Sequence, residues 1–204
     1  MLSRIRRSLA LIPFTAALAS CGDSTAPAGK QTDELRFIKL APDAPPLVTQ
    51  TVSFMAKTRE DREATIFFRP RPGESDSSEF LRFRVEAGAL SRRPDGSAFA
   101  ADDSIRITIT MTGGTDLIFD FQPSGLRFHT LRPARLKIRY ENADHDFDED
   151  GDEDDVDLSL EGTFNIWRQE TATQPWFPLG SIRHLEIDEV EADIFGFTNH
   201  ALAY

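Results

Sequence analysis

The sequence has almost no cysteine, because Cys21 is the only one among its 204 residues. An intrachain disulfide is therefore excluded, and with it the class of small secreted scaffolds that depend on such bonds. Long apolar runs are also lacking, since no segment after residue 20 is apolar enough to cross a membrane as a helix. Apolar residues do not recur at the helical period of about 3.6 residues over any long stretch, which argues against a helical bundle.

Catalytic motifs are lacking as well. His129, His145, His184 and His200 are scattered over different predicted segments. The chain contains no Gly-x-Ser-x-Gly, His-Glu-x-x-His or phosphate-loop pattern. Its many acidic residues would allow a glycosidase pair, but no pair stands out. We therefore expect a protein that is not an enzyme, and a hydrolase is the less favoured alternative.

Basic residues are too few to balance the acidic ones. The chain has 23 Lys and Arg against 34 Asp and Glu, a net charge of −11. Removal of residues 1–20 would take away three arginines and no acid, leaving 20 against 34 and a net charge of −14. So acidic a chain is not expected to bind nucleic acid or anionic lipid headgroups.

The N-terminus has the pattern of a secretory signal. Arg4, Arg6 and Arg7 precede an apolar stretch, residues 8–19, that is too short for a membrane-spanning helix. The segment Leu18-Ala19-Ser20-Cys21 resembles the bacterial lipobox. That resemblance implies a lipoprotein signal peptide at residues 1–20 and lipidation of Cys21, which would anchor the protein to a membrane. An ordinary signal peptide that ends near a cysteine is the alternative.

The residue after the cysteine bears on location. In the sorting pattern of such lipoproteins, Asp directly after the cysteine favours the inner membrane, whereas this chain has Gly22 there. We therefore expect the bacterial cell envelope, with the outer membrane favoured. Residues 21–31 are small and polar and predict a lipidated flexible tether, and residues 32–204 suit one domain.

Alternation of apolar and polar residues dominates residues 32–204. Segments rich in β-branched and aromatic residues are separated by turns of Pro, Gly, Asp and Ser. This pattern predicts an all-β fold with few or no helices, and an antiparallel β-sandwich is favoured over a barrel. The predicted strands are 51–58, 64–70, 80–88, 104–112, 117–123, 134–140, 162–170 and 191–198.

A series of ordered phrases resembles the ZU-five type of β-sandwich module, which has an immunoglobulin-like fold and occurs in ankyrins, netrin receptors and many bacterial surface lipoproteins. The matching sequence segments are FRVEAGAL (83–90), DDSIRITIT (102–110), PSGLRFHTLRPARLKIRY (123–140), FNIWRQE with QPWFPLGS (164–181) and ADIFGFTNHALA (192–203). The resemblance implies that 192–203 is the closing strand. It also implies these core anchors: Trp167, Trp176, Phe128, Leu136, Ile138, Phe164 and Ile166.

The same resemblance raises the question of self-cleavage. Some relatives of this module cleave themselves at His-Phe-Ser in the last strand, where the hydroxyl attacks the preceding carbonyl. Here the matching residues are Gly196, Phe197 and Thr198. Thr198 keeps the hydroxyl, but Gly196 lacks the imidazole that would act as base, so we expect no cleavage.

The segment DHDFDEDGDEDDVD, residues 144–157, holds ten carboxylates in fourteen positions. From Asp146 it matches the D-x-D-x-D-G opening of a calcium loop, in which oxygen ligands alternate and Gly151 permits the sharp turn. We predict a structural Ca²⁺ site there. Asp152 would contribute its backbone carbonyl, and Asp144, Glu149 and Asp155 would be spare carboxylates. The predicted ligands are Asp146, Asp148, Asp150, Asp152, Asp154 and Asp157.

Several features separate this run from an EF-hand. The closing residue is Asp157 where an EF-hand has Glu, Glu153 stands at a usually aliphatic position, and we expect strands on both sides. A solvated acidic loop is the main alternative. A transition metal is disfavoured, because His145 is the one imidazole in the run.

These patterns together favour a structural or protein-interaction β-sandwich on a membrane anchor. A carbohydrate or cell-envelope binding module is the alternative, and it would need exposed aromatic side chains aligned on one face. Tyr140, Trp176, Phe177 and Tyr204 are the candidates for such a face.

Overall fold

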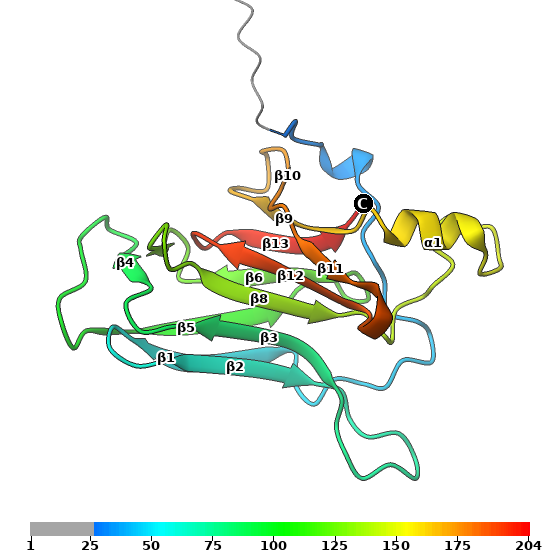
Figure 1. The fold of residues 1–204 in the computed structure, drawn as a ribbon, viewed down its shortest axis with the longest axis horizontal. Coiled ribbons are helices and arrows are strands. Elements are labelled where there is room, and N and C mark those ends of the chain that lie inside the picture. The colour runs from blue at the N-terminus through cyan, green and yellow to red at the C-terminus, as the bar shows by residue number, and fades with distance from the viewer. Residues whose placement is uncertain (1–26) are drawn as a thin grey trace, which may run out of the picture.

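The computed structural model of the chain describes residues 27–204. The predicted signal peptide and the candidate lipidation site Cys21 lie outside the described residues. Within them, two antiparallel sheets form the layers of a β-sandwich, as Figure 1 shows. The predicted all-β sandwich is thereby confirmed.

The larger sheet has six strands and the facing sheet has five. The order in the first is β1 (Thr51–Lys57), β5 (Ser104–Met111), β6 (Ile118–Gln122), β13 (Asn199–Ala203), β9 (Asn165–Gln169) and β10 (Phe177–Pro178). The order in the second is β11 (Ile182–His184), β12 (Glu189–Ile194), β8 (Ala134–Arg139), β3 (Glu79–Val85) and β2 (Arg62–Phe67). A separate pair joins β4 (Leu90–Arg92) to β7 (Arg127–Phe128).

The alternation seen in the sequence accounts for how these strands pack. In β8, Ala134, Leu136 and Ile138 are buried, and the residues between them are exposed or partly exposed. Phenylalanines dominate the shared core: the Phe83 ring lies 5.3 Å from that of Phe121 and 5.5 Å from that of Phe197. Burial of each such ring contributes about 1.5–3 kcal/mol, so this core holds the two layers together.

All seven predicted core anchors are buried, so that prediction is confirmed. The two tryptophans, however, lie outside the main core. Trp167 and Trp176 pack in a second cluster with Leu35, Ala201 and Ala203. Because neighbouring residues of a strand face opposite sides, Ile166 joins the core between the sheets while Trp167 faces the N-terminal segment.

The prediction of a single closing strand at 192–203 is wrong, because this segment contributes one strand to each of the two sheets. β12 pairs with β8 in the five-stranded sheet, whereas β13 lies between β6 and β9 in the six-stranded one. The link between them crosses the end of the sandwich and is held by β7 and its neighbours: the N–H of Phe128 donates to the carbonyl of Phe195, and that of Phe197 to the carbonyl of Leu126, both over 2.9 Å.

Helices are few, as expected. They are α1 (Asp155–Glu161) and two short 3₁₀ turns, η1 (Thr32–Glu34) and η2 (Leu185–Ile187). Among the described residues, no helix combines the length and the apolar character needed to span a membrane. Lys30, at the end of the predicted tether, exchanges two backbone hydrogen bonds with Trp176.

Candidate metal site in the acidic loop

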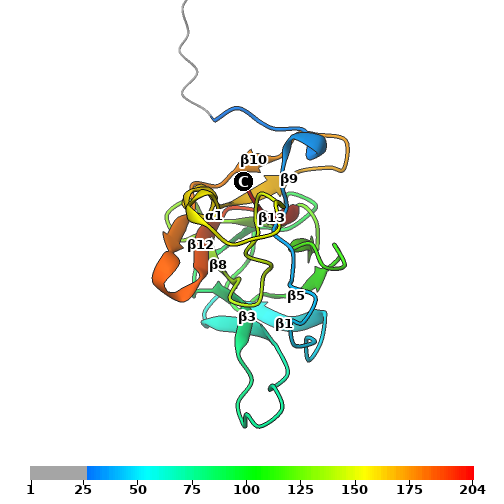
Figure 2. The same ribbon diagram turned by 90° about the vertical axis from the view of Figure 1, so that its right-hand side faces the viewer.

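The acidic run follows β8 and lies at one end of the sandwich, beside the N-terminal segment, as Figure 2 shows. Two backbone links hold these segments together. The N–H of Asp144 donates to the carbonyl of Lys39 over 2.9 Å, and Leu40 forms a β-bridge with Ala143. The run therefore starts from a fixed point.

The expectation that strands flank the run on both sides is wrong at its C-terminal end, where α1 begins inside the run at Asp155. The cause is a capping box. The side chain of Asp154 accepts from the N–H of Val156 at 2.6 Å, and that of Asp157 accepts from the N–H of Asp154 at 2.9 Å. The sequence carried this signal, because Asp154 and Asp157 have the capping spacing and Gly162 follows the helix.

Three of the six predicted ligands converge. Asp146, Asp148 and Asp157 each present a carboxylate oxygen, and these oxygens lie within 4.8 Å of one another. The first two come from the loop, and the third comes from the first turn of α1. An ion of Ca²⁺ size binds oxygens at about 2.3–2.6 Å, so two oxygens on one ion can be up to about 5 Å apart, and these three are within that limit.

Asp157 is the most strongly held member of this group and is 3 % exposed. Its Oδ1 accepts from the N–H groups of Phe147 at 2.6 Å and Asp148 at 3.2 Å, and its Oδ2 accepts from that of Asp154 at 2.9 Å. These backbone donors, with Asp154 the strongest, lower the pKa of Asp157. The site therefore keeps an ionised carboxylate in a defined position at neutral pH.

Asp146 shapes the turn in the middle of the run. Its two carboxylate oxygens accept from the N–H groups of Asp150 at 3.0 Å and Gly151 at 2.9 Å. Gly151 has φ +103°, a conformation that favours glycine. The predicted sharp turn at Gly151 is confirmed.

The other three predicted ligands are not part of the group. Asp150 accepts from the N–H of Asp152 at 3.3 Å, and Asp154 caps α1. Asp152 itself is exposed. Of the six predicted ligands, three thus converge through their side chains, while the carboxylates of Asp150 and Asp154 accept hydrogen bonds from the backbone.

Repulsion between the carboxylates is visible in two pKa shifts. Loss of hydration and the nearby Asp150 raise the pKa of Asp148. The pKa of Asp152 is raised by Asp150 first and then by loss of hydration. Because both shifts disfavour the charged form, a bound cation would relieve the repulsion.

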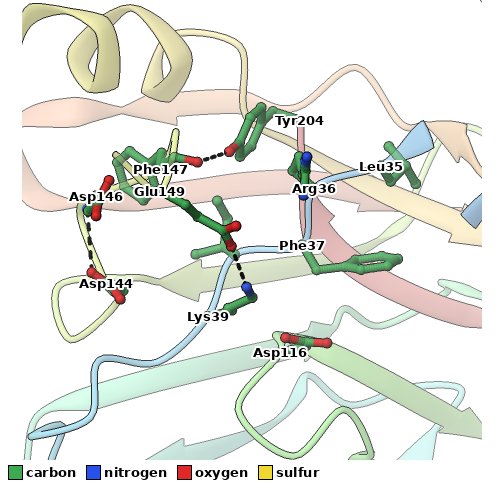
Figure 3. Close-up of a pocket in the computed structure, with 11 residues that line it drawn as sticks. Leu35, Arg36, Phe37, Lys39, Asp116, Asp144, Asp146, Phe147, Glu149 and Tyr204 are labelled. Atoms are coloured by element: carbon green, nitrogen blue, oxygen red, sulfur yellow. Dashed lines mark hydrogen bonds and ion pairs between the residues drawn. The ribbon is translucent and has the colours of Figure 1, made fainter. Parts of the chain in front are cut away.

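A hollow of about 180 Å³ separates the run from the N-terminal segment (Figure 3). Glu149, expected to be a spare carboxylate, crosses it to pair with Lys39, with 2.5 Å between Nζ and Oε1. The Tyr204 hydroxyl donates to the carbonyl of Phe147 on the same side. The run is therefore tied to two distant parts of the chain.

The four aromatic candidates for a glycan face lie in different surroundings. Tyr140 and Trp176 are buried, and Phe177 and Tyr204 are partly buried. The Trp176 ring packs edge-on against Phe37, with centroids 5.6 Å apart. Tyr140 donates to Glu161 at 2.6 Å inside the protein. These two rings serve the packing of the domain.

Comparison with known proteins finds no matching family model, no matching curated protein and no matching solved structure.

Proposed function

We propose that this chain is a non-catalytic, lipid-anchored protein of the bacterial cell envelope, a structural or protein-interaction β-sandwich whose acidic loop binds Ca²⁺. The observation that carries the calcium part is the convergence of Asp146, Asp148 and Asp157. The N-terminal pattern supports the anchor, with Cys21 as the lipidated residue and the outer membrane as the favoured location.

The chemistry of the group favours Ca²⁺ over other metals. Three carboxylates offer hard oxygen ligands, which suit Ca²⁺ better than a transition metal. Loop carbonyls and water would complete the six to eight ligands that Ca²⁺ takes. Modules outside the cytoplasm bind Ca²⁺ with dissociation constants of about 10⁻⁴ to 10⁻³ M, and we expect this range here.

The proposed role of the ion is structural. It would join the loop carboxylates of Asp146 and Asp148 to Asp157 on α1. Through the pair of Lys39 and Glu149, the loop is also linked to the segment that leads from the tether. Ca²⁺ would thereby stiffen the end of the domain nearest the N-terminal segment, leaving the rest of the surface for a protein partner.

A calcium titration of residues 27–204 tests the proposal. Calorimetry and thermal unfolding would follow Ca²⁺ addition, with NaCl of equal ionic strength as the reference. About 100-fold excess over the dissociation constant should add roughly 2.7 kcal/mol of stability, and a chelator should remove it. Asp146→Asn combined with Asp148→Asn should abolish the response.

A matched control keeps charge loss separate from ligand loss. Asp43 and Asp76 are exposed and lie outside the acidic run. Asp43→Asn combined with Asp76→Asn removes the same charge and should leave the calcium response intact. If Ca²⁺ does no more than NaCl, the run is a solvated loop and the calcium proposal fails.

A further inference from the structure

A second hollow, of about 190 Å³, lies where the link between β12 and β13 crosses the sandwich. It shares no residue with the acidic run. Its polar lining residues are Arg127, Arg168, Glu170 and His200, and Leu179 and Phe195 supply apolar surface. The lining therefore combines charged, polar and apolar groups.

His200 is the unusual member of this lining, because it is polar and has no exposed area. Its Nδ1 lies 3.1 Å from the carbonyl oxygen of Thr198. A carbonyl can only accept, so Nδ1 carries the hydrogen and Nε2 carries a lone pair. Nε2 has no hydrogen-bond partner among the described residues. Burial lowers the pKa of His200 to about 3, so the ring stays neutral.

The lining also presents hydrogen-bond donors. Arg168 forms a hydrogen-bonded ion pair with Oε1 of Glu170, and Nη1 of Arg127 lies 3.8 Å from the same oxygen. The side chains of Arg168, Glu170 and Arg127 are 37 %, 36 % and 49 % exposed, so solvent reaches them. Guanidinium groups held by one carboxylate keep further N–H groups for a ligand.

Gly196 provides the space in which Arg127 lies. A Cβ at this position would be 2.7 Å from Nη1 of Arg127 and 3.2 Å from the carbonyl oxygen of Leu126. The backbone of Gly196 is not in the left-handed region, so its small size matters here rather than its conformation. Alanine at this position would displace the guanidinium.

We propose that this hollow binds a single sugar unit. Hydroxyl groups both donate and accept, so separate hydroxyls of one sugar can donate to Nε2 of His200 and to Glu170 and accept from Arg127 and Arg168. A deprotonated anion has no hydrogen for Nε2, and a cation would face two guanidinium groups. Leu179 and Phe195 offer apolar contact for the C–H face of the sugar, and Phe195 is 44 % exposed.

The volume limits the ligand to a small one, because drug-sized ligands occupy pockets of about 300–1,000 Å³. Nε2 has no exposed area in this conformation, so neighbouring side chains must shift as a hydroxyl approaches. Arg127 and Phe195 are each about half exposed and have solvent to move into.

Nuclear magnetic resonance of the imidazole nitrogens tests the proposal. The full-length chain, labelled with ¹⁵N at histidine and held in a detergent without a sugar headgroup, would be titrated with glucose, galactose, mannose and N-acetylglucosamine. The His200 signals are assigned by their loss in His200→Phe. We expect a saturable shift of the Nε2 signal with at least one of these sugars, unchanged by a calcium chelator.

The sugar affinity of variants and the response of the Nε2 signal to anions test the proposal further. Gly196→Ala and Arg168→Gln should each weaken binding about tenfold or more, the effect of one lost hydrogen bond. Arg135→Gln is the control. Arg135 does not line the hollow, and its Nε lies 2.9 Å from the Glu191 carboxylate. The proposal is overturned if no sugar shifts the signal, if phosphate or acetate shifts it and sugars do not, or if both variants bind as tightly as the control.

Discussion

The Asp157 carboxylate accepts a 2.6 Å hydrogen bond from the backbone N–H of Phe147, ten residues earlier in the chain. This contact joins the first turn of α1 to the start of the acidic loop. It places the loop in a closed form through protein groups alone. The carboxylates of the candidate site are thereby partly preorganised, which lowers the entropy cost of binding a cation there.

Asp157→Asn should destabilise the protein at neutral pH in the presence of a chelator. An amide has one acceptor oxygen, so the substitution replaces one of the two oxygens that now serve Phe147, Asp148 and Asp154 with an NH₂ donor. Since the folded-state pKa of Asp157 is lowered, its stabilisation is present above the unfolded value of about 3.9 and is lost as pH falls through the folded value.

Urea unfolding of both proteins at a series of pH values measures this difference. The gap in unfolding free energy should stay constant from neutral pH to about pH 5 and shrink below about pH 4. Asp155→Asn, at an exposed neighbouring position, should show no such gap. A gap that widens in acid would contradict the assignment.

Tyr140→Phe should cost about 1–3 kcal/mol of stability. The Tyr140 hydroxyl donates to Oε1 of Glu161 at 2.6 Å, and both residues are buried. Burial, and then the bond to Glu161, raises the pKa of Tyr140, so the hydroxyl keeps its hydrogen at physiological pH. Without it, a buried carboxyl group at the end of α1 loses its donor.

A double-mutant cycle with Glu161→Gln isolates this pair. Chemical denaturation of the four proteins should give a coupling energy well above experimental error. Simple addition of the two single effects would mean that the hydrogen bond contributes little.

Lys137→Met should destabilise the protein by about 2 kcal/mol. Lys137 Nζ lies 2.7 Å from Glu189, whose side chain is 6 % exposed, and 3.0 Å from Glu191. Loss of the ammonium leaves a nearly buried carboxylate with the longer contact to Arg139, at 3.5 Å. Thermal and urea unfolding would give the value.

Lys57→Met is the matched comparison. Lys57 also pairs with a glutamate at 2.7 Å, Glu60, but the two side chains are 41 % and 47 % exposed. Its loss should change stability by less than about 0.5 kcal/mol, because exposed pairs are weak. Equal effects of the two substitutions would show that burial of Glu189 has no energetic consequence.

The mature chain should have a single intact mass. Gly196 supplies no imidazole base, and the Thr198 hydroxyl donates to the carbonyl of Asn199 at 3.2 Å. Because β13 lies between β6 and β9, a cleaved fragment would stay bound under native conditions. Mass spectrometry must therefore be done after denaturation, and a fragment that begins at Thr198 would contradict this prediction.

The strands could be predicted because alternation is a local property. Leu136 and Ile138 alternate with polar residues, and both face the core. The partners of each strand could not be predicted in the same way. Residues 192–203 have the pattern of one strand, yet Ala192 faces Leu136 in one sheet and Ala201 pairs with Trp167 in the other. Pairing over such distances depends on the whole core.

The acidic run shows the same division. Its composition and the Asp146 to Gly151 spacing were sufficient to predict a tight, oxygen-rich turn. Which carboxylates converge was decided by backbone N–H groups that become available as the chain folds, since Asp157 is drawn to Phe147 and Asp154 is used to cap α1.

Local pattern therefore determined most of the strands and the position of the acidic turn. The tertiary structure decided the division of residues 192–203, the three converging carboxylates and the isolation of His200 Nε2 in a second hollow. The physical reason is that periodicity and turn chemistry act between near neighbours, whereas burial and the choice of hydrogen-bond partners depend on segments that are distant in sequence.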